Sequence, residues 1–448
     1  MQSKSFSITV KSKIKPFKKI IKVDADKSLS IRSFLISSIS HDVSSINNIL
    51  ESEDVKSTIQ ACKKLGVKIV RFKTGSYKVF GKGLGSLLAK KNLTIDCGNS
   101  GTLARLLIGI LSTTPDIEIN ITGDKSLKKR SMKKLINLMS EFGATFLPKG
   151  KYNFPLKLIS SEMPIGIHYK SGVSAQLKSA VILAGLNSYG NTEILEKTLS
   201  RDHTENMLLN NKQVIKIKKN KEKKIIVFGK KFLKSIHTQV SGDPSSASFF
   251  VALTLLNKNS SIKIKNVGLN PTRTGFFQLL KKQGVKIQYK NLKKEHGELR
   301  GDVNVKSYNL KPIKATGDLY SIMVDEYPIL FVMAALTKGI SSFKNIGDLA
   351  SKESNRITEM QKVLKQVGVK STFSNNQLKI FGKGMIDARN KIVKIPDLGD
   401  HRICMSSFIL AVLTGAKTKI KNFSTVFTSS PSFLKIMKSL GANYEIQK

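Results

Sequence analysis

Five glycines in this chain stand at the same kind of junction, between the end of an amphipathic helix pattern and the start of a short strand pattern: Gly66, Gly143, Gly284, Gly368 and Gly441. Glycine ends helices well because it enters the left-handed backbone region without steric cost. The spacings are 77 residues from Gly66 to Gly143, 84 from Gly284 to Gly368, and 73 from Gly368 to Gly441. The remaining gap of 141 residues holds two such periods, with a degenerate copy near Asn211. The chain is therefore predicted to contain six copies of one unit.

Each copy reads as strand, loop, helix, glycine, strand and a turn to a further strand. This order predicts a mixed α/β fold in which helices cover one face of each sheet. A chain of 448 residues suits two domains of about 200 residues, and three copies fit each domain. Turn residues beside helix starts place the crossovers at residues 22–26 and 241–245. We therefore expect residues 25–243 to form one domain, and residues 1–24 to join residues 244–448 in the other.

Charge bears on function, because 76 basic residues against 31 acidic ones give a formal net charge of +45. Such an excess is typical of proteins that bind nucleic acid. The lysines, however, are spread through every segment, which is typical of a solvated surface. The scarce arginines are more informative, since a guanidinium group can hold a carboxylate or phosphate by two hydrogen bonds. We predict no nucleic-acid partner.

Location and cofactors follow from what the sequence lacks. Its apolar runs are shorter than the roughly 18–20 residues of a membrane span, and the first 17 residues offer no continuous apolar stretch of the kind a secretory signal needs. The cysteines have no paired spacing, which argues against a disulfide framework and a structural zinc site: Cys62, Cys97 and Cys404. We predict a cytoplasmic protein with no membrane partner and no metal or other cofactor.

Four short segments place small or polar residues and an arginine where a helix pattern begins: Asp26–Arg32, Gly98–Arg105, Gly123–Arg130 and Lys352–Arg356. The first amide groups of a helix are unpaired and partly positive, so a hydroxyl and a guanidinium group one turn inside add donors to an anion site. Each segment alone could be an ordinary cap with a surface arginine, and none matches a known nucleotide-binding motif. Four together predict binding of phosphate or carboxylate groups.

Three further segments add other chemistry. Residues 171–180 place neutral hydrogen-bonding groups at a helix start, which suits either sugar-like hydroxyls or a simple polar entry. Asp325 and Glu326 directly precede an apolar helix pattern, where a carboxylate is either a cap or a base. Residues 400–405 also precede an apolar run and add Arg402, while His401 alone is more typical of a structural residue.

Together with residues 200–205 and 270–275, these segments resemble the signature motifs of the EPSP synthase family, the 3-phosphoshikimate 1-carboxyvinyltransferases, in the family's order and across nearly the whole chain. The resemblance implies the enolpyruvyl transferase fold: a two-domain inside-out α/β barrel, each domain with three βαβαββ repeats and the active site in the cleft between them. It implies transfer of the enolpyruvyl group of phosphoenolpyruvate to the 5-hydroxyl of shikimate 3-phosphate by a monomer. The cell-wall enolpyruvyl transferase, which lacks the first and last motifs, and a nucleic-acid-binding protein are the alternatives.

The resemblance also assigns residues. Shikimate 3-phosphate is expected at Lys27, Ser28, Arg32, Ser174, Gln176, Ser200, Asp325 and Lys352. Phosphoenolpyruvate is expected at Lys27, Gly101, Arg130, Gln176, Arg356 and Arg402. Asp325 is expected to accept the proton of the attacking hydroxyl, and either Glu353 or Lys27 to protonate the methylene carbon. The chemistry agrees, because both substrates carry phosphate and carboxylate and need fixed cations to offset their repulsion.

Overall fold

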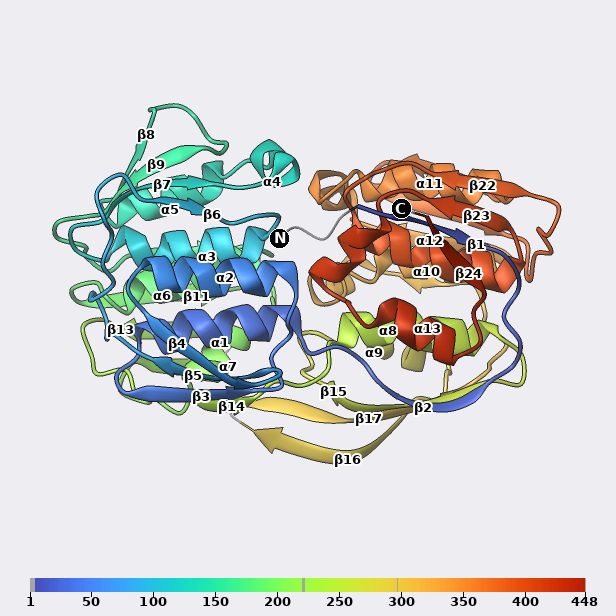
Figure 1. Ribbon diagram of the computed structural model, residues 1–448, viewed down its shortest axis with the longest axis horizontal. Coiled ribbons are helices and arrows are strands. Elements are labelled where there is room, and N and C mark those ends of the chain that lie inside the picture. The colour runs from blue at the N-terminus through green and yellow to red at the C-terminus, as the bar shows by residue number, and fades with distance from the viewer. Residues whose placement is uncertain (1–4, 220–221, 296, 448) are drawn as a thin grey trace. The chain divides into compact units, whose positions relative to one another are not determined.

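The computed structural model describes residues 5–219, 222–295 and 297–447. Within these ranges the chain forms six four-stranded sheets and divides into two compact units, whose helices and strands are labelled in Figure 1. Unit 1 takes in the chain up to Asp24, Gly242–Lys293 and the chain from Leu299 onward. Unit 2 takes in Ala25–Ser241 and Lys294–Glu298. The following paragraphs describe each unit separately.

Unit 2 contains the strands β3 (Val43–Asn47), β4 (Lys68–Lys73), β5 (Ser76–Phe80), β6 (Thr94–Asp96), β7 (Glu118–Thr122), β8 (Thr145–Leu147), β9 (Leu156–Ile159), β10 (His168–Ser171), β11 (Asn191–Glu196), β12 (Ile215–Lys219), β13 (Lys223–Phe228) and β14 (His237–Gln239). Its helices are α1 (Lys27–Ile39), α2 (Glu53–Lys64), α3 (Gly101–Ser112), α4 (Lys125–Lys129), α5 (Lys133–Glu141), α6 (Ala175–Gly185) and α7 (His203–Leu208). The sheets have the strand orders β14-β3-β5-β4, β6-β7-β9-β8 and β10-β11-β13-β12.

Unit 1 contains the strands β1 (Ser7–Val10), β2 (Lys18–Lys22), β15 (Ser261–Gly268), most of β16 (Gln288–Glu295) and β17 (Glu298–Lys306), and β18 (Lys314–Ala315), β19 (Gly339–Lys344), β20 (Lys370–Ser374), β21 (Gln377–Gly382), β22 (Ile392–Ile395), β23 (Lys417–Ile420) and β24 (Tyr444–Gln447). Its α-helices are α8 (Pro244–Leu256), α9 (Gly275–Lys282), α10 (Tyr327–Ala335), α11 (Arg356–Gln366), α12 (His401–Thr414) and α13 (Phe433–Ser439). Short 3-10 helices are η1 (Gly317–Ile322), η2 (Gly347–Ser351) and η3 (Phe423–Thr428). The sheet orders are β16-β17-β15-β2, β18-β19-β21-β20 and β22-β23-β1-β24.

The six sheets share one pairing pattern. In each, an edge strand runs parallel to its neighbour, and that neighbour pairs antiparallel with the third strand. The first strand of the chain completes the last sheet, since β1 lies between β23 and β24. The predicted repeat is therefore confirmed, and one copy is assembled from both ends of the chain.

The predicted glycine junctions follow α2, α5, α9, α11 and α13, and all five glycines have a positive φ: Gly66, Gly143, Gly284, Gly368 and Gly441. Their φ values lie between 85° and 95°, a region that is strained for residues with a side chain. The sixth junction, predicted near Asn211, connects α7 to β12 through a turn in which the Asn211 amide donates to the Leu208 carbonyl. It makes the same connection without a glycine.

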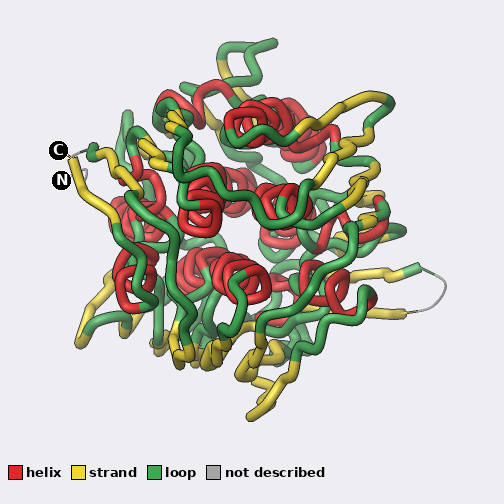
Figure 2. Tube along the Cα trace, turned by 90° about the vertical axis from the view of Figure 1, so that its right-hand side faces the viewer, coloured by secondary structure: helices red, strands yellow, loops and turns green. Residues whose placement is uncertain are grey.

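The most buried helices of each unit pack together inside it, and helices such as α2 and α11 keep one face exposed. In unit 1 every residue of α8, α10 and α12 is buried, and these three helices pack on one another. A helix that is apolar on all sides is stable only when it is surrounded in this way. In unit 2, α3 packs against α1 and α6. Figure 2, viewed onto unit 1, shows helices toward the middle and strands around them. This arrangement confirms the predicted inside-out α/β fold.

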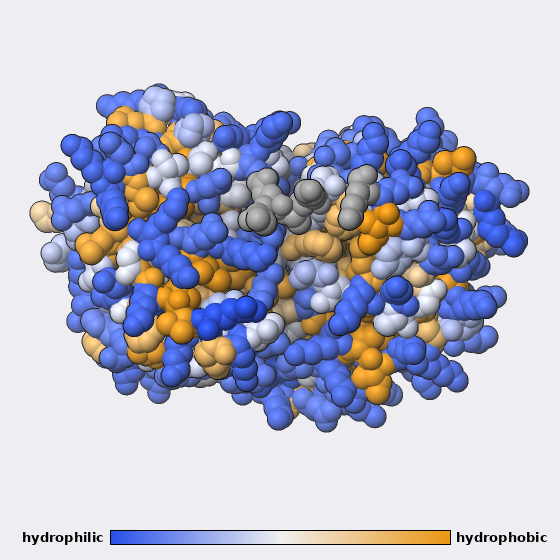
Figure 3. All heavy atoms as spheres, in the orientation of Figure 1, coloured by the Kyte–Doolittle hydropathy of each residue, from blue (hydrophilic) through white to orange (hydrophobic). Residues whose placement is uncertain are grey.

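The surface is as polar as the composition predicts. Hydrophilic residues cover much of the face drawn in Figure 3, over helices and strands alike, with apolar patches between them. In the part of the chain that the structure describes, no helix is both long enough and apolar enough to cross a membrane.

Candidate active site

The segments predicted to bind anions do contain helix starts, but α4 ends at Lys129, so Arg130 follows that helix instead of lying one turn inside it. Side-chain oxygens of the residue before the helix accept a hydrogen bond from an amide of the first turn in α1, α3, α4, α6, α11 and α12: Asp26, Ser100, Asp124, Ser174, Asn355 and Asp400. Such caps satisfy one of the unpaired donors of a helix start. Ser174 accepts from the Leu177 amide at 3.4 Å, which leaves its own hydroxyl hydrogen for another acceptor. Capping and ligand binding are thus compatible at this position.

Arg32 of α1 is buried and held by neutral groups. Its Nε donates to Thr204 Oγ1 at 2.9 Å, its Nη2 to Ser179 Oγ at 3.1 Å, and its Nη1 to the Ser28 carbonyl at 3.1 Å. Burial lowers the pKa of Arg32 to about 10, which the charges of Asp26 and Glu205 oppose only in part. A buried cation whose hydrogen-bond partners are uncharged is well suited to receive an anion.

Lys27, the first residue of α1, is tied to a carboxylate. Its Nζ lies 3.0 Å from Asp54 Oδ2. Asp54 itself is buried on α2, so the ammonium group is held at the amino-terminal end of α1. Ser28 follows it and is half-buried. Lys27 and Ser28, both predicted to bind shikimate 3-phosphate, therefore stand together at one helix start.

Two guanidinium groups crowd Gly101 at the start of α3. A Cβ atom at this position would stand 2.6 Å from Arg105 Nη1 and 3.2 Å from Arg130 Nη1, so any side chain here would displace the guanidinium ends. Arg105 Nη1 also donates to Gln176 Oε1 at 2.8 Å, and Gln176 Nε2 donates to Thr102 Oγ1 at 3.0 Å. Three predicted phosphoenolpyruvate residues of unit 2, Gly101, Arg130 and Gln176, are thus brought together around Arg105.

Ser200 is placed differently from the other predicted ligand residues. It is fully buried, and its hydroxyl donates to Glu196 Oε1 at 2.8 Å while its amide donates to the same oxygen at 3.0 Å. A serine has one hydroxyl hydrogen, so this one is engaged by a carboxylate. Arg201, the next residue, is half-buried.

In unit 1, Arg356 at the start of α11 gathers three carboxylates. Its Nε donates to Asp400 Oδ2 at 2.9 Å, its Nη2 donates to Glu353 Oε2 at 2.6 Å, and its Nη1 lies 3.6 Å from Asp325 Oδ1. Burial alone would lower the pKa of Arg356, but the charges of Asp400, Glu353 and Asp325 outweigh burial and raise it above its ordinary value. The guanidinium group is therefore permanently charged and fixes the predicted base, Asp325, beside the predicted acid, Glu353.

Arg273 holds the other side of Asp325. Its Nη1 lies 3.9 Å from Asp325 Oδ2, and its Nη2 donates to Asp243 Oδ1 at 3.0 Å. The side chain of Asp325 is 24% exposed, whereas that of Arg273 is 2% exposed. The predicted base thus reaches solvent while two buried cations fix its direction.

Arg402 is a buried cation near the same cluster. Its amide donates to Asp400 Oδ1 at 2.9 Å, and its guanidinium group lies 5.8 Å from the centre of the Phe249 ring. Its Nε and Nη1 have no hydrogen-bond acceptor among the described residues, although the side chain is buried. Buried donors without acceptors are costly, so this group is poised to bind an anion.

Lys352, which completes the predicted set, pairs with Asp348 one turn earlier in η2 and is half-buried. The structure thus places Asp325, Lys352, Glu353, Arg356 and Arg402 in unit 1, and the remaining predicted residues in unit 2. Among the described residues, no group of three His, Cys, Asp or Glu side chains could hold a metal ion.

Several residues that contact the predicted site were not assigned to it from sequence. They are Asp54 beside Lys27, Arg105 beside Gly101, Ser179 and Thr204 beside Arg32, Glu196 beside Ser200, and Arg273 beside Asp325. Arg105 and Arg273 carry a usable signal, because arginine is scarce in this chain and both stand in the motifs quoted above. Glu196 continues the alternating buried face of β11, which is also a signal, whereas Asp54, Ser179 and Thr204 are recognisable only once the helices are packed.

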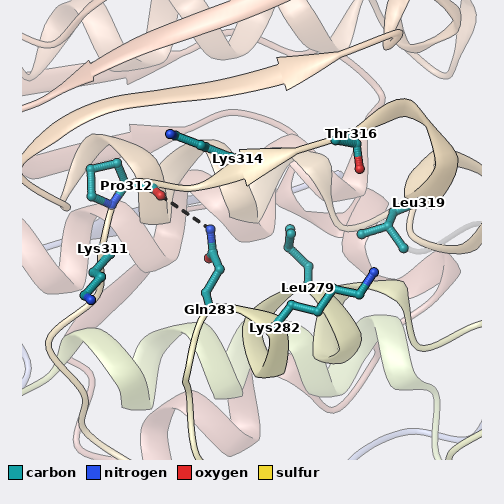
Figure 4. A pocket seen from close by; sticks show the side chains of 8 residues that line it. All are labelled: Leu279, Lys282, Gln283, Lys311, Pro312, Lys314, Thr316 and Leu319. Atoms are coloured by element: carbon teal, nitrogen blue, oxygen red, sulfur yellow. Dashed lines mark hydrogen bonds between the residues drawn. The ribbon is translucent and has the colours of Figure 1, made fainter.

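A pocket of about 340 Å³ lies in unit 1, away from the predicted residues (Figure 4). Gln283 crosses it to donate a weak hydrogen bond to the Pro312 carbonyl at 3.4 Å. The residues that line it are Leu279, Lys282, Gln283, Lys311, Pro312, Lys314, Thr316 and Leu319. Its three lysines are exposed, and none of the predicted substrate-binding or catalytic residues contributes to it.

Comparison with known proteins identifies the family. The sequence profile of the family EPSP synthase (3-phosphoshikimate 1-carboxyvinyltransferase) matches residues 11–437. A 3-phosphoshikimate 1-carboxyvinyltransferase of Zymomonas mobilis is 36% identical over 98% of this chain and 97% of its own length. One from Thermodesulfovibrio yellowstonii is 39% identical over 96% and 98% respectively.

Solved structures give the same result. An EPSP synthase from Acinetobacter baumannii has a TM-score of 0.84 and 32% identity, covering 99% of this chain and all of that one. An enolpyruvyl transferase from Streptomyces tendae has a TM-score of 0.77 at 13% identity, covers 99% of each chain, and shares the fold. On the family match and these identities, the chain belongs to the EPSP synthase (3-phosphoshikimate 1-carboxyvinyltransferase) family.

Proposed function

We propose that this chain transfers the enolpyruvyl group of phosphoenolpyruvate to the 5-hydroxyl of shikimate 3-phosphate, forming 5-enolpyruvylshikimate 3-phosphate and releasing phosphate. One observation carries the proposal beyond family membership. One cluster sets the buried Arg356 among the buried Asp400 and the partly exposed Asp325 and Glu353. Arg402, whose amide donates to Asp400, has guanidinium hydrogens without an acceptor in the described chain. An anion receptor thus lies beside carboxylates able to move protons.

The addition step uses these carboxylates. Asp325 accepts the proton of the 5-hydroxyl as that oxygen attacks C2 of phosphoenolpyruvate, and Glu353 or Lys27 donates a proton to the methylene carbon. The product is a tetrahedral intermediate that carries both substrates. Arg356 and Arg273 support the base, because they hold Asp325 from two sides while it remains partly exposed.

In the elimination step, the new methyl group gives back the proton that it received from Glu353 or Lys27, and phosphate is expelled. Negative charge grows on the departing group, so fixed guanidinium groups stabilise it without reorganising. Arg356, Arg402 and Arg130 are proposed to bind phosphoenolpyruvate, together with Lys27, Gly101 and Gln176. Arg105 Nη1 and Arg130 Nη1 lie 2.6 and 3.2 Å from the position that a Cβ of Gly101 would take, which supports this placement.

Shikimate 3-phosphate is proposed to bind through Lys27, Ser28 and Arg32 at α1, through Ser174, Gln176 and Ser200 nearby in unit 2, and through Asp325 and Lys352. Arg32 supports the assignment, because its three hydrogen-bond partners are neutral. The neutral donors Ser174 and Gln176 suit ring hydroxyls.

The proposal requires residues of both units to act on one pair of substrates, with the boundary between domains near residues 24 and 243. We propose a change of relative domain position on binding. Small-angle scattering should show a smaller radius of gyration with both substrates than without. An unchanged radius at saturation contradicts this part of the proposal.

We further propose that the protein works as a monomer in the cytoplasm and that its basic surface has no specific nucleic-acid partner. The spread of lysines through every segment of the sequence supports the last point, since a specific site usually concentrates its positive charge on one face or along one helix. Binding to duplex DNA that persists at about 200 mM salt would oppose it, because non-specific phosphate contacts weaken steeply with salt.

An assay of phosphate release by the purified protein tests the reaction directly. We expect release that requires both phosphoenolpyruvate and shikimate 3-phosphate. A uridine-diphosphate sugar offered as the acceptor should give no product. Release with that sugar and none with shikimate 3-phosphate would reject the proposed acceptor.

A further inference from the structure

Four buried charged side chains in unit 2 have no part in the reaction proposed above. Lys178 of α6, Glu196 at the end of β11, Glu205 of α7 and Lys223 at the start of β13 have side chains no more than 8% exposed, and we call them the ion quartet. Lys178 Nζ lies 2.6 Å from Glu196 Oε1 and 2.7 Å from Glu205 Oε1. Lys223 Nζ lies 3.1 Å from Glu196 Oε2 and 3.2 Å from Glu205 Oε1.

Stability alone is a weak explanation for the ion quartet. Removing charges from water costs several kcal/mol per ion, and well-packed apolar side chains in place of a buried ion pair are often as stable or more so. The strand register nevertheless puts Glu196 directly opposite Lys223, on the face of β11 that also buries Thr192 and Ile194. Four charges at core positions therefore call for a role in addition to packing.

The first link from the ion quartet to the substrate site is Ser200. Glu196 Oε1 accepts the Ser200 amide at 3.0 Å, the Ser200 hydroxyl at 2.8 Å and the Lys178 ammonium at 2.6 Å. The carboxylate therefore fixes the segment between β11 and α7, which contains Ser200 and Arg201. Because the Ser200 hydroxyl donates its one hydrogen to Glu196, Ser200 anchors this segment and can meet shikimate 3-phosphate only as a hydrogen-bond acceptor.

The second link is Arg32. Ser179 follows Lys178 on α6, and Thr204 precedes Glu205 on α7. Ser179 and Thr204 accept hydrogen bonds from the Arg32 guanidinium group at 3.1 and 2.9 Å, and Thr204 donates to Ser179 at 2.8 Å. Lys178 and Glu205 of the ion quartet join α6 to α7. Each of them is adjacent in sequence to a residue that accepts a hydrogen bond from Arg32.

The ion quartet combines two lysines with two glutamates, so its charges balance. Burial works to raise the pKa of Glu196, yet Lys178, Lys223 and Ser200 outweigh it and hold that pKa below its ordinary value. Burial likewise works to lower the pKa of Lys223, and Glu205 and Glu196 outweigh it and raise that pKa. Two positive and two negative charges have almost no net field at a ligand, so any effect on binding must come from position.

We propose that the ion quartet is a positioning unit for shikimate 3-phosphate: through Glu196 it fixes Ser200 and the adjacent segment, and through α6 and α7 it fixes the direction of Arg32. The inference rests on the proposed function, and its members are positioning residues that touch no substrate. It predicts that substitutions in the ion quartet weaken the binding of shikimate 3-phosphate and leave the binding of phosphoenolpyruvate and the turnover almost unchanged.

Two variants test this, compared with the wild-type protein. Glu196→Gln keeps the shape but leaves an uncompensated positive charge, and the pair Lys178→Met with Glu196→Met removes one charge of each sign and leaves Lys223 paired with Glu205. We expect both to raise KM for shikimate 3-phosphate by about 10-fold or more, since small misplacements of binding groups have effects of this size. The KM for phosphoenolpyruvate and kcat should stay within about twofold.

The paired variant separates positioning from folding. Its thermal midpoint should exceed that of Glu196→Gln, because its charges balance, while calorimetry should still show weak binding of shikimate 3-phosphate. If the paired variant recovered wild-type affinity together with stability, the ion quartet would be merely structural and the inference would be overturned. Equal weakening of the binding of both substrates would also overturn it. Asp302→Asn, which removes a largely buried acid from unit 1, is the matched control and should change neither KM.

The same measurements separate this inference from the proposed function. A wild-type protein that neither binds shikimate 3-phosphate nor releases phosphate with it would reject the proposed function. A wild-type protein that does both, beside ion-quartet variants with wild-type affinity, would reject the positioning role alone.

Discussion

Two buried guanidinium groups near helix starts, Arg32 in unit 2 and Arg356 in unit 1, have opposite surroundings. Arg32 donates to two hydroxyls and a carbonyl, and burial lowers its pKa to about 10. Arg356 lies among Asp400, Glu353 and Asp325, which outweigh burial and raise its pKa. The same side chain is therefore short of negative charge in one unit and surrounded by it in the other.

This difference indicates a division of labour. A buried cation with neutral partners gains most from binding an anionic ligand, because the ligand supplies the missing charge. A cation already paired with three carboxylates gains less from a further anion, and it also fixes those carboxylates in place. We therefore infer that Arg32 contributes mainly affinity for shikimate 3-phosphate, whereas Arg356, proposed to bind phosphoenolpyruvate, also positions the carboxylates proposed to transfer protons.

The largest expected effect tests the role of unit 1. Asp325→Ala removes the proposed base, and kcat should fall by about 10³-fold, within the range that general acid–base groups contribute. Calorimetry should show that shikimate 3-phosphate still binds, because Arg32 and Lys27 remain. Phosphate release and calorimetry together measure both quantities.

Asp387→Asn is a suitable control for that variant. Asp387 is an exposed acid of unit 1 that pairs with Arg389, and its loss should leave kcat unchanged. If Asp325→Ala kept more than about a tenth of wild-type turnover, another group would have to be the base and the division of labour would fail.

A matched pair of substitutions addresses the comparison itself. Arg356→Met leaves three carboxylates without their shared cation. It should lower the free energy of unfolding by about 3–5 kcal/mol, as when one partner of a buried pair is removed. Arg32→Met removes a buried cation together with its hydrogen bonds and should change it by about 1 kcal/mol at most. Chemical denaturation of the two variants measures both values, and equal losses of stability would contradict the contrast between the two sites.

The same pair should differ in affinity. Arg32→Met should weaken shikimate 3-phosphate by about 100-fold, the equivalent of one strong charge-assisted interaction. Titration calorimetry on the folded variant gives this value. A change below about threefold would mean that Arg32 does not contact the phosphate.

Gly101→Ala should have a smaller effect. The added Cβ would stand 2.6 Å from Arg105 Nη1, so the flexible guanidinium end must move. We expect KM for phosphoenolpyruvate to rise by about 10-fold, as for other small displacements of binding groups. Gly172→Ala is the control, because a Cβ there meets nothing within 4 Å. Equal effects of the two alanines would point to backbone stiffening instead of crowding.

The repeat and the fold could be predicted from sequence because local rules fix them. Each of the five junction glycines adopts a positive φ, and that requirement is visible in sequence as a glycine between two patterns. The sequence did not predict that one sheet is assembled from strands at both ends of the chain. It depends on β1 pairing with β23 and β24, a contact across more than 400 residues that no local signal specifies.

The candidate site also has features that the sequence predicts and features that it does not. Arginines near helix starts could be recognised, but the groups that hold them could not, because Ser179 and Thr204 are ordinary helix residues until α6 and α7 pack beside α1. Glu196 had a usable signal, since it continues the alternating buried face of β11 after Ile194. A charge at a core position of a strand is unusual enough to predict a buried partner.

The smallest expected effect is a proton taken up on binding. With a pKa near 10, about half of the Arg32 side chains are neutral at pH 10, and a bound phosphate should raise that pKa toward its ordinary value. Binding of shikimate 3-phosphate at pH 10 should then take up as much as about half a proton per site through Arg32, and almost none at pH 7. Calorimetry in two buffers of different ionisation enthalpy measures this number. The Arg32→Met variant should lose that share of the proton uptake. An uptake equal to that of the wild type would mean that another group titrates. The contrast between Arg32 and Arg356 would then lose its basis, because Arg32 would not be short of negative charge.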